Sequence, residues 1–190
     1  SGLLAEVGRE RIEETIDPEQ AIDRALETYL KKGYDSDWVH QRLLSIRIRN
    51  ELTDEWQKRG VEKGREFAIL TDEITRTWSG MTTRQYKNLK GLKKENLRDN
   101  MSDTELVLTM LAEASTRDIS KASKPEGFSG SMEVARQGGE GAGVARKALE
   151  ERTGAPVITA QNAAQMNTLV VGMIEEAAAL PAQAEADDKE

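Results

Sequence analysis

Apolar residues recur at intervals of three and four along most of this 190-residue chain, and no stretch alternates apolar and polar residues as an amphipathic β-strand does. A clear example is the series Phe67, Leu70, Ile74 and Trp78, which glycine follows at position 80. This spacing places the side chains on one side of an α-helix, because one helical turn takes about 3.6 residues. The sequence therefore predicts an all-α fold without a sheet, a bundle of about seven to eight helices.

Capping residues and glycines divide the chain into separate helices. A side-chain acceptor followed three residues later by Gln or Glu starts a helix, as at Thr82 with Gln85 and at Ser102 with Glu105. Glycine ends a helix because it adopts the left-handed conformation without strain. We therefore expect helices over residues 3–16, 18–32, 37–59, 66–78, 82–89, 102–119 and 131–152, a short one after Gly91, a last one from Thr159 or Asn162 to Ile174, and one loop over residues 121–131.

These elements fill residues 1–180, either as a single helical domain or as a main bundle over 1–120 with a C-terminal helical pair over 131–180. Residues 181–190 contain too little apolar surface to bury, and we expect a disordered acidic tail there.

The predicted helix over 131–152 is rich in glycine. It contains Gly138, Gly139, Gly141 and Gly143, and each costs about 1 kcal/mol of helix propensity relative to alanine. Two explanations remain open. Either another helix approaches so closely that only glycine fits, within one chain or between the two copies of a homodimer, or the helix breaks at this point.

Residue composition excludes several kinds of site. The chain has no cysteine and a single histidine, His40, so we expect no disulfide, no metal and no cofactor. No apolar run reaches the roughly 18 residues of a membrane-spanning helix. We expect no membrane partner, and the lack of cysteine fits a reducing, cytoplasmic location. No nucleophile motif is present, so we expect no catalytic residues and no enzymatic activity.

One segment departs from the acidic character of the chain, whose formal net charge is -7. Five cations and no acid lie between Thr82 and Lys94, and a sixth follows nearby; the six are Arg84, Lys87, Lys90, Lys93, Lys94 and Arg98. Steps of three residues place Arg84, Lys87 and Lys90 on one helical face. They form either a surface that binds nucleic acid or an acidic partner, or the solvated side of an ordinary helical corner.

Two further patterns bear on this basic segment. The helix over 66–78, the turn with Gly80 and the helix from 82 have helix-turn-helix proportions. Other cations would widen the surface if their helix packs beside it, unless neighbouring acids neutralise them; they are Arg42, Arg47, Arg49, Lys58 and Arg59.

Three long strings carry a resemblance to a known family: RNELTDEW at residues 49–56, YKNLKGLKKENLRDNM at 86–101 and GVARKALEERTG at 143–154. They resemble the C-terminal helical region of the DNA-damage-inducible protein D family, which belongs with phage-type BRO and antirepressor proteins. The resemblance covers roughly residues 21–162.

The resemblance implies a non-enzymatic regulatory module of the DNA-damage (SOS) or phage response. Members of this family typically carry a BRO-type N-terminal domain that is regarded as the DNA-binding part, and interference with recombinase filaments on single-stranded DNA is a theme of the family. We therefore expect this chain to bind a recombinase filament, a phage repressor, or single-stranded or duplex DNA through the six basic residues. The alternative is a helical oligomerisation module whose activity lies in an N-terminal domain missing here.

Overall fold

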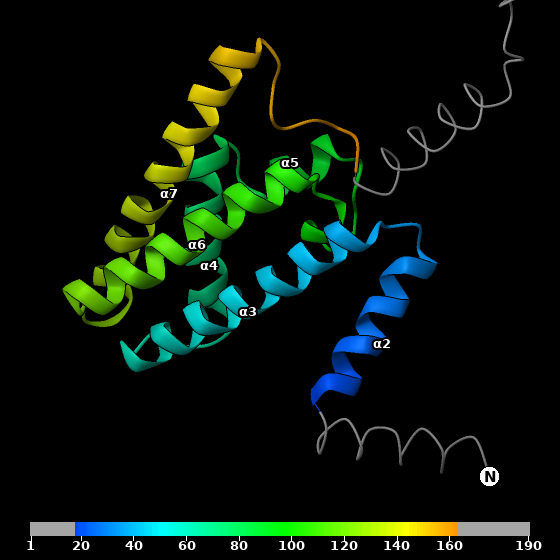
Figure 1. Ribbon diagram of the computed structural model, residues 1–190. Coiled ribbons are helices and arrows are strands. Elements are labelled where there is room, and N and C mark those ends of the chain that lie inside the picture. The colour runs from blue at the N-terminus through cyan, green and yellow to red at the C-terminus, as the bar shows by residue number, and fades with distance from the viewer. Residues whose placement is uncertain (1–17, 163–190) are drawn as a thin grey trace, which may run out of the picture.

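The computed structural model describes residues 18–162, and these residues form six α-helices and one short 3-10 helix (Figure 1). The elements are α2 (Pro18–Lys31), α3 (Ser36–Lys58), α4 (Arg65–Ser79), α5 (Thr83–Leu89), η1 (Arg98–Asn100), α6 (Asp103–Ser123) and α7 (Gly127–Thr153). No β-strand occurs in this part of the chain, which confirms the all-α prediction. The helix expected over 3–16, most of the last predicted helix and the acidic tail lie outside the described residues.

Local signals in the sequence set most of the helix ends. The Asp35 side chain accepts a hydrogen bond from the backbone N of Trp38 at 2.8 Å and caps α3. The predicted capping boxes at Thr82 and Ser102 start α5 and α6. Gly80 ends α4 with a φ of 79°, a left-handed conformation that favours glycine.

The predicted loop over residues 121–131 is wrong. α6 continues to Ser123 and α7 begins at Gly127, so only residues 124–126 connect the two helices. Lys124 turns the chain with a φ of 50°, and the backbone N of Gly127 donates to the carbonyl of Arg59 at 2.7 Å. The first turns of α7 are helical although their residues are poor helix formers, because Phe128 and Met132 pack against the core.

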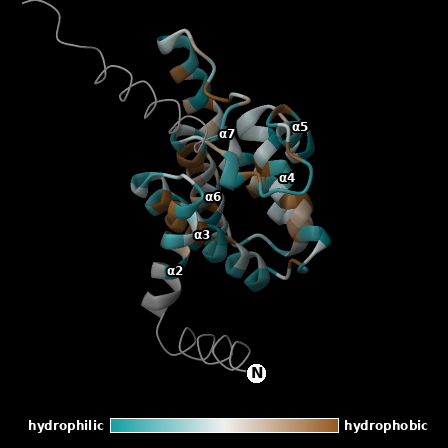
Figure 2. Ribbon diagram, turned by 90° about the vertical axis from the view of Figure 1, so that its right-hand side faces the viewer, coloured by the Kyte–Doolittle hydropathy of each residue, from teal (hydrophilic) through white to brown (hydrophobic). Residues whose placement is uncertain are grey.

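The longer helices pack around a core that includes all three tryptophans. α7 lies against α6 and α4, and α3 lies against the other side of α6 (Figure 1). Trp38, Trp56 and Trp78 are almost fully buried, together with Leu70 and Leu106. Figure 2 shows hydrophilic and hydrophobic residues interleaved along the same helices, as expected of helices with one buried and one exposed face.

The glycine-rich helix α7 does not break, and its glycines mark a close approach within the chain. A Cβ added at Gly138 would lie 1.9 Å from Thr116 Oγ1 of α6, and one added at Gly139 would lie 2.7 Å from Thr77 Cβ of α4. Gly143 likewise faces α4. Gly141 is exposed, with nothing within 4 Å of its added Cβ, so it does not belong with the packing glycines. Because Gly138, Gly139 and Gly143 are buried in their own chain, they are not available as a dimer contact.

Candidate anion-binding site

The structure separates the six basic residues that the sequence grouped together. Arg84, Lys93 and Lys94 are exposed, and Lys87 is half-buried. Lys90 and Arg98 instead turn toward the interior, where each pairs with a buried glutamate. The group is therefore divided between an outer surface and the inside of the fold.

Lys90 is part of the core, and its assignment to a partner-binding surface is wrong. α5 ends at Leu89, and the Lys90 side chain enters the interior, where its Nζ lies 2.8 Å from Glu105 Oε2. Both side chains are fully buried. The Nζ also donates to the carbonyl of Gln161 at 2.6 Å, and Glu105 Oε1 accepts the backbone N of Thr159 at 3.1 Å. This ion pair thus fastens residues 159–161 to the start of α6.

Arg98 is also not an outer-surface residue. It lies on η1, and its guanidinium forms an ion pair with the Glu113 carboxylate of α6, whose side chain is 1% exposed. Arg98 contributes instead to the wall of a cleft, together with Lys87.

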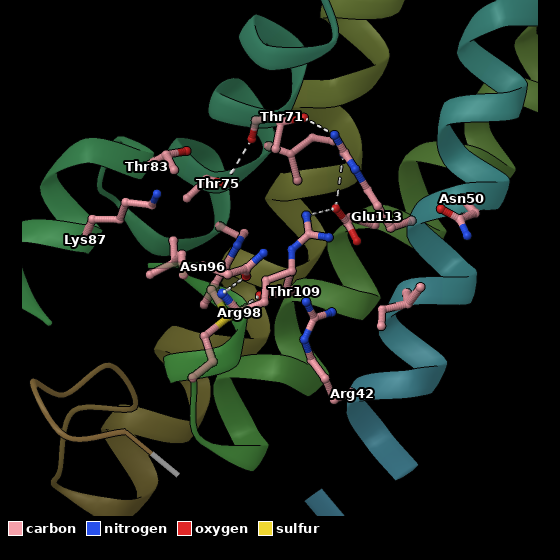
Figure 3. A pocket seen from close by; sticks show the side chains of 16 residues that line it. Arg42, Asn50, Thr71, Thr75, Thr83, Lys87, Asn96, Arg98, Thr109 and Glu113 are labelled. Carbon is pink, nitrogen blue, oxygen red and sulfur yellow. Dashed lines mark hydrogen bonds and ion pairs between the residues drawn. The ribbon is translucent and has the colours of Figure 1, made fainter. Parts of the chain in front are cut away.

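This cleft has a volume of about 400 Å³ and lies among α3, α4, α5, α6 and η1. Positions 42, 46, 49 and 50 of α3 line it, since steps of three, four and seven residues share one helical face. Figure 3 shows Arg98 and Glu113 at the centre of the site, with Lys87 entering from α5 on one side and Arg42 from α3 on another.

Two guanidinium groups share one carboxylate in the cleft. Arg49 Nη1 lies 3.3 Å from Glu113 Oε1, the same oxygen that accepts from Arg98. Arg49 Nη2 donates to Thr71 Oγ1 at 2.5 Å, and its guanidinium lies 5.1 Å from the Trp56 ring centroid. Burial lowers the pKa of Arg49, the positive charge of Arg98 lowers it further, and Glu113 acts against both.

Arg42 is anchored by Asp99 of η1. Its Nε donates to Asp99 Oδ1 at 2.8 Å and its Nη1 to Ser45 Oγ at 2.9 Å. The hydroxyl of Tyr29 on α2 donates to the same Asp99 oxygen at 2.9 Å, and that of Tyr34 donates to the Asp99 carbonyl. Burial, with the negative charge of Asp99, raises the pKa of Tyr34 to about 12. Asp99 therefore ties α2 and α3 to η1.

A second hollow, of about 530 Å³, adjoins the cleft on the outer side of α5. Arg84, Lys93 and Leu92 line it, and it shares Thr83 and Lys87 with the cleft. Lys87 thus faces both spaces. The three basic residues that line this hollow, together with the exposed Lys94 that follows Lys93 in the sequence, are called the basic rim below; the four are Arg84, Lys87, Lys93 and Lys94.

Two carboxylates reduce the positive charge of the basic rim. Asp72 Oδ1 accepts the backbone N of Thr83 at 2.7 Å inside the second hollow. Glu95 Oε2 accepts the backbone N of Lys93 and of Lys94, at 2.7 and 2.9 Å. Hydrogen bonds from the backbone of Glu95 itself, of Lys93 and of Lys94, with the nearby charge of Lys87, lower the pKa of Glu95 and keep it ionised.

Sequence reasoning found only part of the cleft. Arg42 and Arg49 do lie beside the basic segment, as the sequence allowed, because seven residues place them on one face of α3. Arg47 and Arg59 instead pair along α3 with glutamates four residues away. The sequence did not reveal that Glu113 belongs to the cleft, since nothing around this residue marks it as a buried acid.

Other kinds of site find no support in residues 18–162. No group of three or more His, Asp or Glu residues there could hold a metal ion. His40 lies on the exposed side of α3, with Nδ1 2.6 Å from the carbonyl of Ser36. No described helix combines the length and apolar character needed to cross a membrane.

Comparison with known proteins does not identify the chain. No protein-family model matches it, and no curated protein matches it either.

Proposed function

We propose that this chain is a non-enzymatic regulatory module that binds nucleic acid phosphates through the basic rim, and that it acts in the DNA-damage or phage response. The observation that carries the proposal is the hollow where Arg84, Lys87 and Lys93 converge from α5 and the loop after it. Lysine and arginine that meet phosphates release bound counterions, which gives affinity without reading base sequence.

Two further considerations favour nucleic acid as the partner. Arginine forms forked, charge-assisted hydrogen bonds with phosphate oxygens, and the rim lies beside a cleft that contains three arginines. The resemblance to the DNA-damage-inducible protein D family points to single-stranded DNA and to the recombinase filaments that form on it. We therefore place single-stranded DNA, free or within such a filament, first among the partners.

Fluorescence anisotropy with single-stranded and duplex oligonucleotides at two salt concentrations tests the proposal. The triple variant Arg84→Glu, Lys87→Glu, Lys93→Glu should lose at least about tenfold in affinity and keep its helical circular dichroism. Because only three or four phosphates can meet the rim, the slope of log K against log salt should be roughly -2 to -3 for a single strand.

A matched control separates the rim from the overall charge. The variant Lys58→Glu, Lys63→Glu, Lys121→Glu makes the same charge change at exposed positions near the far ends of α3 and α6 (Figure 1). It should bind nearly as well as the wild type. Equal losses in the two triple variants would show that binding follows net charge alone, and an unchanged affinity in the rim variant would end the proposal.

The alternative, an oligomerisation module, has less support from the packing of the glycines. Three of the four glycines that suggested a dimer contact are buried against Thr77 or Thr116 of their own chain. A solution mass that corresponds to a stable dimer would restore this alternative through some other surface.

A further inference from the structure

The cleft behind the basic rim holds more positive than negative charge. Four cations line it, Arg42, Arg49, Lys87 and Arg98. Glu113 is the only acid among the lining residues, and Asp99 pairs with Arg42. Lys87 also has Asp72 in the second hollow and Glu95 nearby. In the wall of the cleft itself the cations outnumber the carboxylates, in a space partly shielded from water where charge interactions are stronger than in bulk solvent.

Several donors in the cleft have no acceptor within residues 18–162. The Nε and Nη1 atoms of Arg42 donate hydrogen bonds to Asp99 and Ser45, and its Nη2 has no acceptor among these residues. The Nη2 atom of Arg98 donates to Glu113, and its Nε and Nη1 have no acceptor there. Lys87 takes part in no hydrogen bond or ion pair in the described part of the chain. These groups come from three different elements and border one space.

Neutralising Glu113 does not by itself require this arrangement. One arginine would be enough to neutralise Glu113, yet two guanidiniums converge on its Oε1 atom at a cost in mutual repulsion. The network instead holds these side chains in fixed positions, Arg49 between Thr71 and Glu113 and Arg42 between Ser45 and Asp99. Donors fixed in this way lose little conformational entropy when an anion binds.

The rest of the wall suits an organic group attached to the anion. Ile46, Leu97 and Met101 provide apolar surface, and Asn50 and Asn96 provide amides that can donate and accept hydrogen bonds. The volume of about 400 Å³ lies within the roughly 300–1,000 Å³ typical of small-molecule sites.

We propose that this cleft binds a phosphate monoester, either a free mononucleotide or the phosphorylated end of a nucleic acid strand. A monoester carries close to two negative charges at neutral pH and the diester within a strand carries one, so the excess of cations in the wall of the cleft favours the monoester. In the second form the inference rests on the proposed function: the terminal phosphate occupies the cleft, and the next phosphates follow past Lys87 onto the basic rim.

Calorimetric titration with deoxyadenosine monophosphate tests the cleft directly, with deoxyadenosine and ionic-strength-matched sulfate as comparisons. We expect the nucleotide to bind at least about tenfold more tightly than the nucleoside or sulfate. Ile46 is suitable for mutation because it is 37% exposed at the wall of the cleft and lies outside the arginine network. Ile46→Glu should weaken nucleotide binding about tenfold or more, and the neutral Ile46→Gln should change it less than about threefold.

Circular dichroism on both variants excludes unfolding as the cause of a loss. Equal binding of nucleotide and nucleoside, or equal affinities in Ile46→Glu and Ile46→Gln, would overturn the inference.

Oligonucleotides with a 5′-phosphate, a 3′-phosphate or no terminal phosphate separate the two sources of the ligand. Tighter binding of one phosphorylated form, with competition by the mononucleotide, assigns the cleft to a strand end. Binding of the mononucleotide without any preference among the oligonucleotides assigns it to a free nucleotide.

The two proposals fail separately. Arg84→Glu with Lys93→Glu changes only the rim, so it should weaken oligonucleotide binding and leave mononucleotide binding intact. If oligonucleotides bind through the rim but no phosphate monoester binds, the cleft inference is overturned and the proposed function stands. If the mononucleotide binds and oligonucleotides do not, the proposed function is overturned and the cleft inference stands.

Discussion

The glycines of α7 allow a sharp test of the packing, because Gly138 and Gly141, three residues apart, should respond to alanine with changes in stability of opposite sign. At Gly138 the added Cβ would lie 1.9 Å from Thr116 Oγ1 and 2.6 Å from the Thr116 backbone N. A rotamer change can move the hydroxyl but not the backbone, so α6 and α7 would have to separate by several tenths of an ångström. Overpacking costs about 1–3 kcal/mol, and a clash with backbone belongs to the upper half of that range, so the cost exceeds the roughly 1 kcal/mol gained in helix propensity by about 1–2 kcal/mol.

Gly141 is the matched control in the same helix. It is exposed and its added Cβ would meet nothing within 4 Å, so alanine there should gain most of the roughly 1 kcal/mol by which alanine exceeds glycine in helix propensity. We expect Gly141→Ala to stabilise the protein by about 0.5–1 kcal/mol and Gly138→Ala to destabilise it by about 1–2 kcal/mol or more. Urea unfolding followed by circular dichroism measures both, with the slope m checked for constancy.

A Gly138→Ala variant as stable as the wild type would refute the close approach of α6 and α7. Thr116→Ala in the Gly138→Ala background should restore only part of the loss. It removes the hydroxyl and leaves the backbone N in place.

Two further predictions concern ionised side chains. Lys90→Met should destabilise the protein by about 3–5 kcal/mol, because it leaves the buried Glu105 carboxylate without its partner, and Lys90→Met with Glu105→Gln should lose less in the same urea assay. Burial would raise the pKa of Glu73, but hydrogen bonds from Arg76 and Arg136 outweigh it and hold the pKa below its usual 4.5. The ionised Glu73 therefore stabilises the fold above pH 4.5, and this stabilisation is lost as the pH falls. The free energies of unfolding of the wild type and Glu73→Gln should then converge in acid. A constant difference between them down to pH 3 would contradict the ion pairs assigned to Glu73.

The helix boundaries could be predicted where the interaction that fixes them joins residues three or four positions apart. The caps at Asp35, Thr82 and Ser102 each join a side chain to a backbone group three residues away, so the local sequence determines them. The start of α7 could not be found in this way. Its first residues have the composition of a loop, and they are helical because Phe128 packs against a core formed by distant parts of the chain.

The candidate site was harder to predict because its ion pairs join distant positions. Lys87 and Lys90 are three residues apart and share a face on an ideal helix. The helix ends between them, however, and Lys90 then meets Glu105 inside the fold. Likewise, Arg49 and Glu113 are separated by 64 residues. Spacing can place two side chains on one face, but it does not reveal which carboxylate will neutralise them.

The net charge of the chain is a poor guide to what the cleft can bind, for a physical reason. The value of -7 counts every residue, whereas salt screens the interaction between exposed charges over about 8 Å at physiological ionic strength. An anion in the cleft therefore responds mainly to the four cations of its wall and to the carboxylates near them; these acids are Glu113, Asp99, Asp72 and Glu95. The acidic remainder of the surface instead opposes non-specific coating by polyanions. A confined positive site on an acidic chain thus fits the proposed binding of a single phosphate-bearing end or a short stretch of strand better than it fits the covering of long nucleic acid.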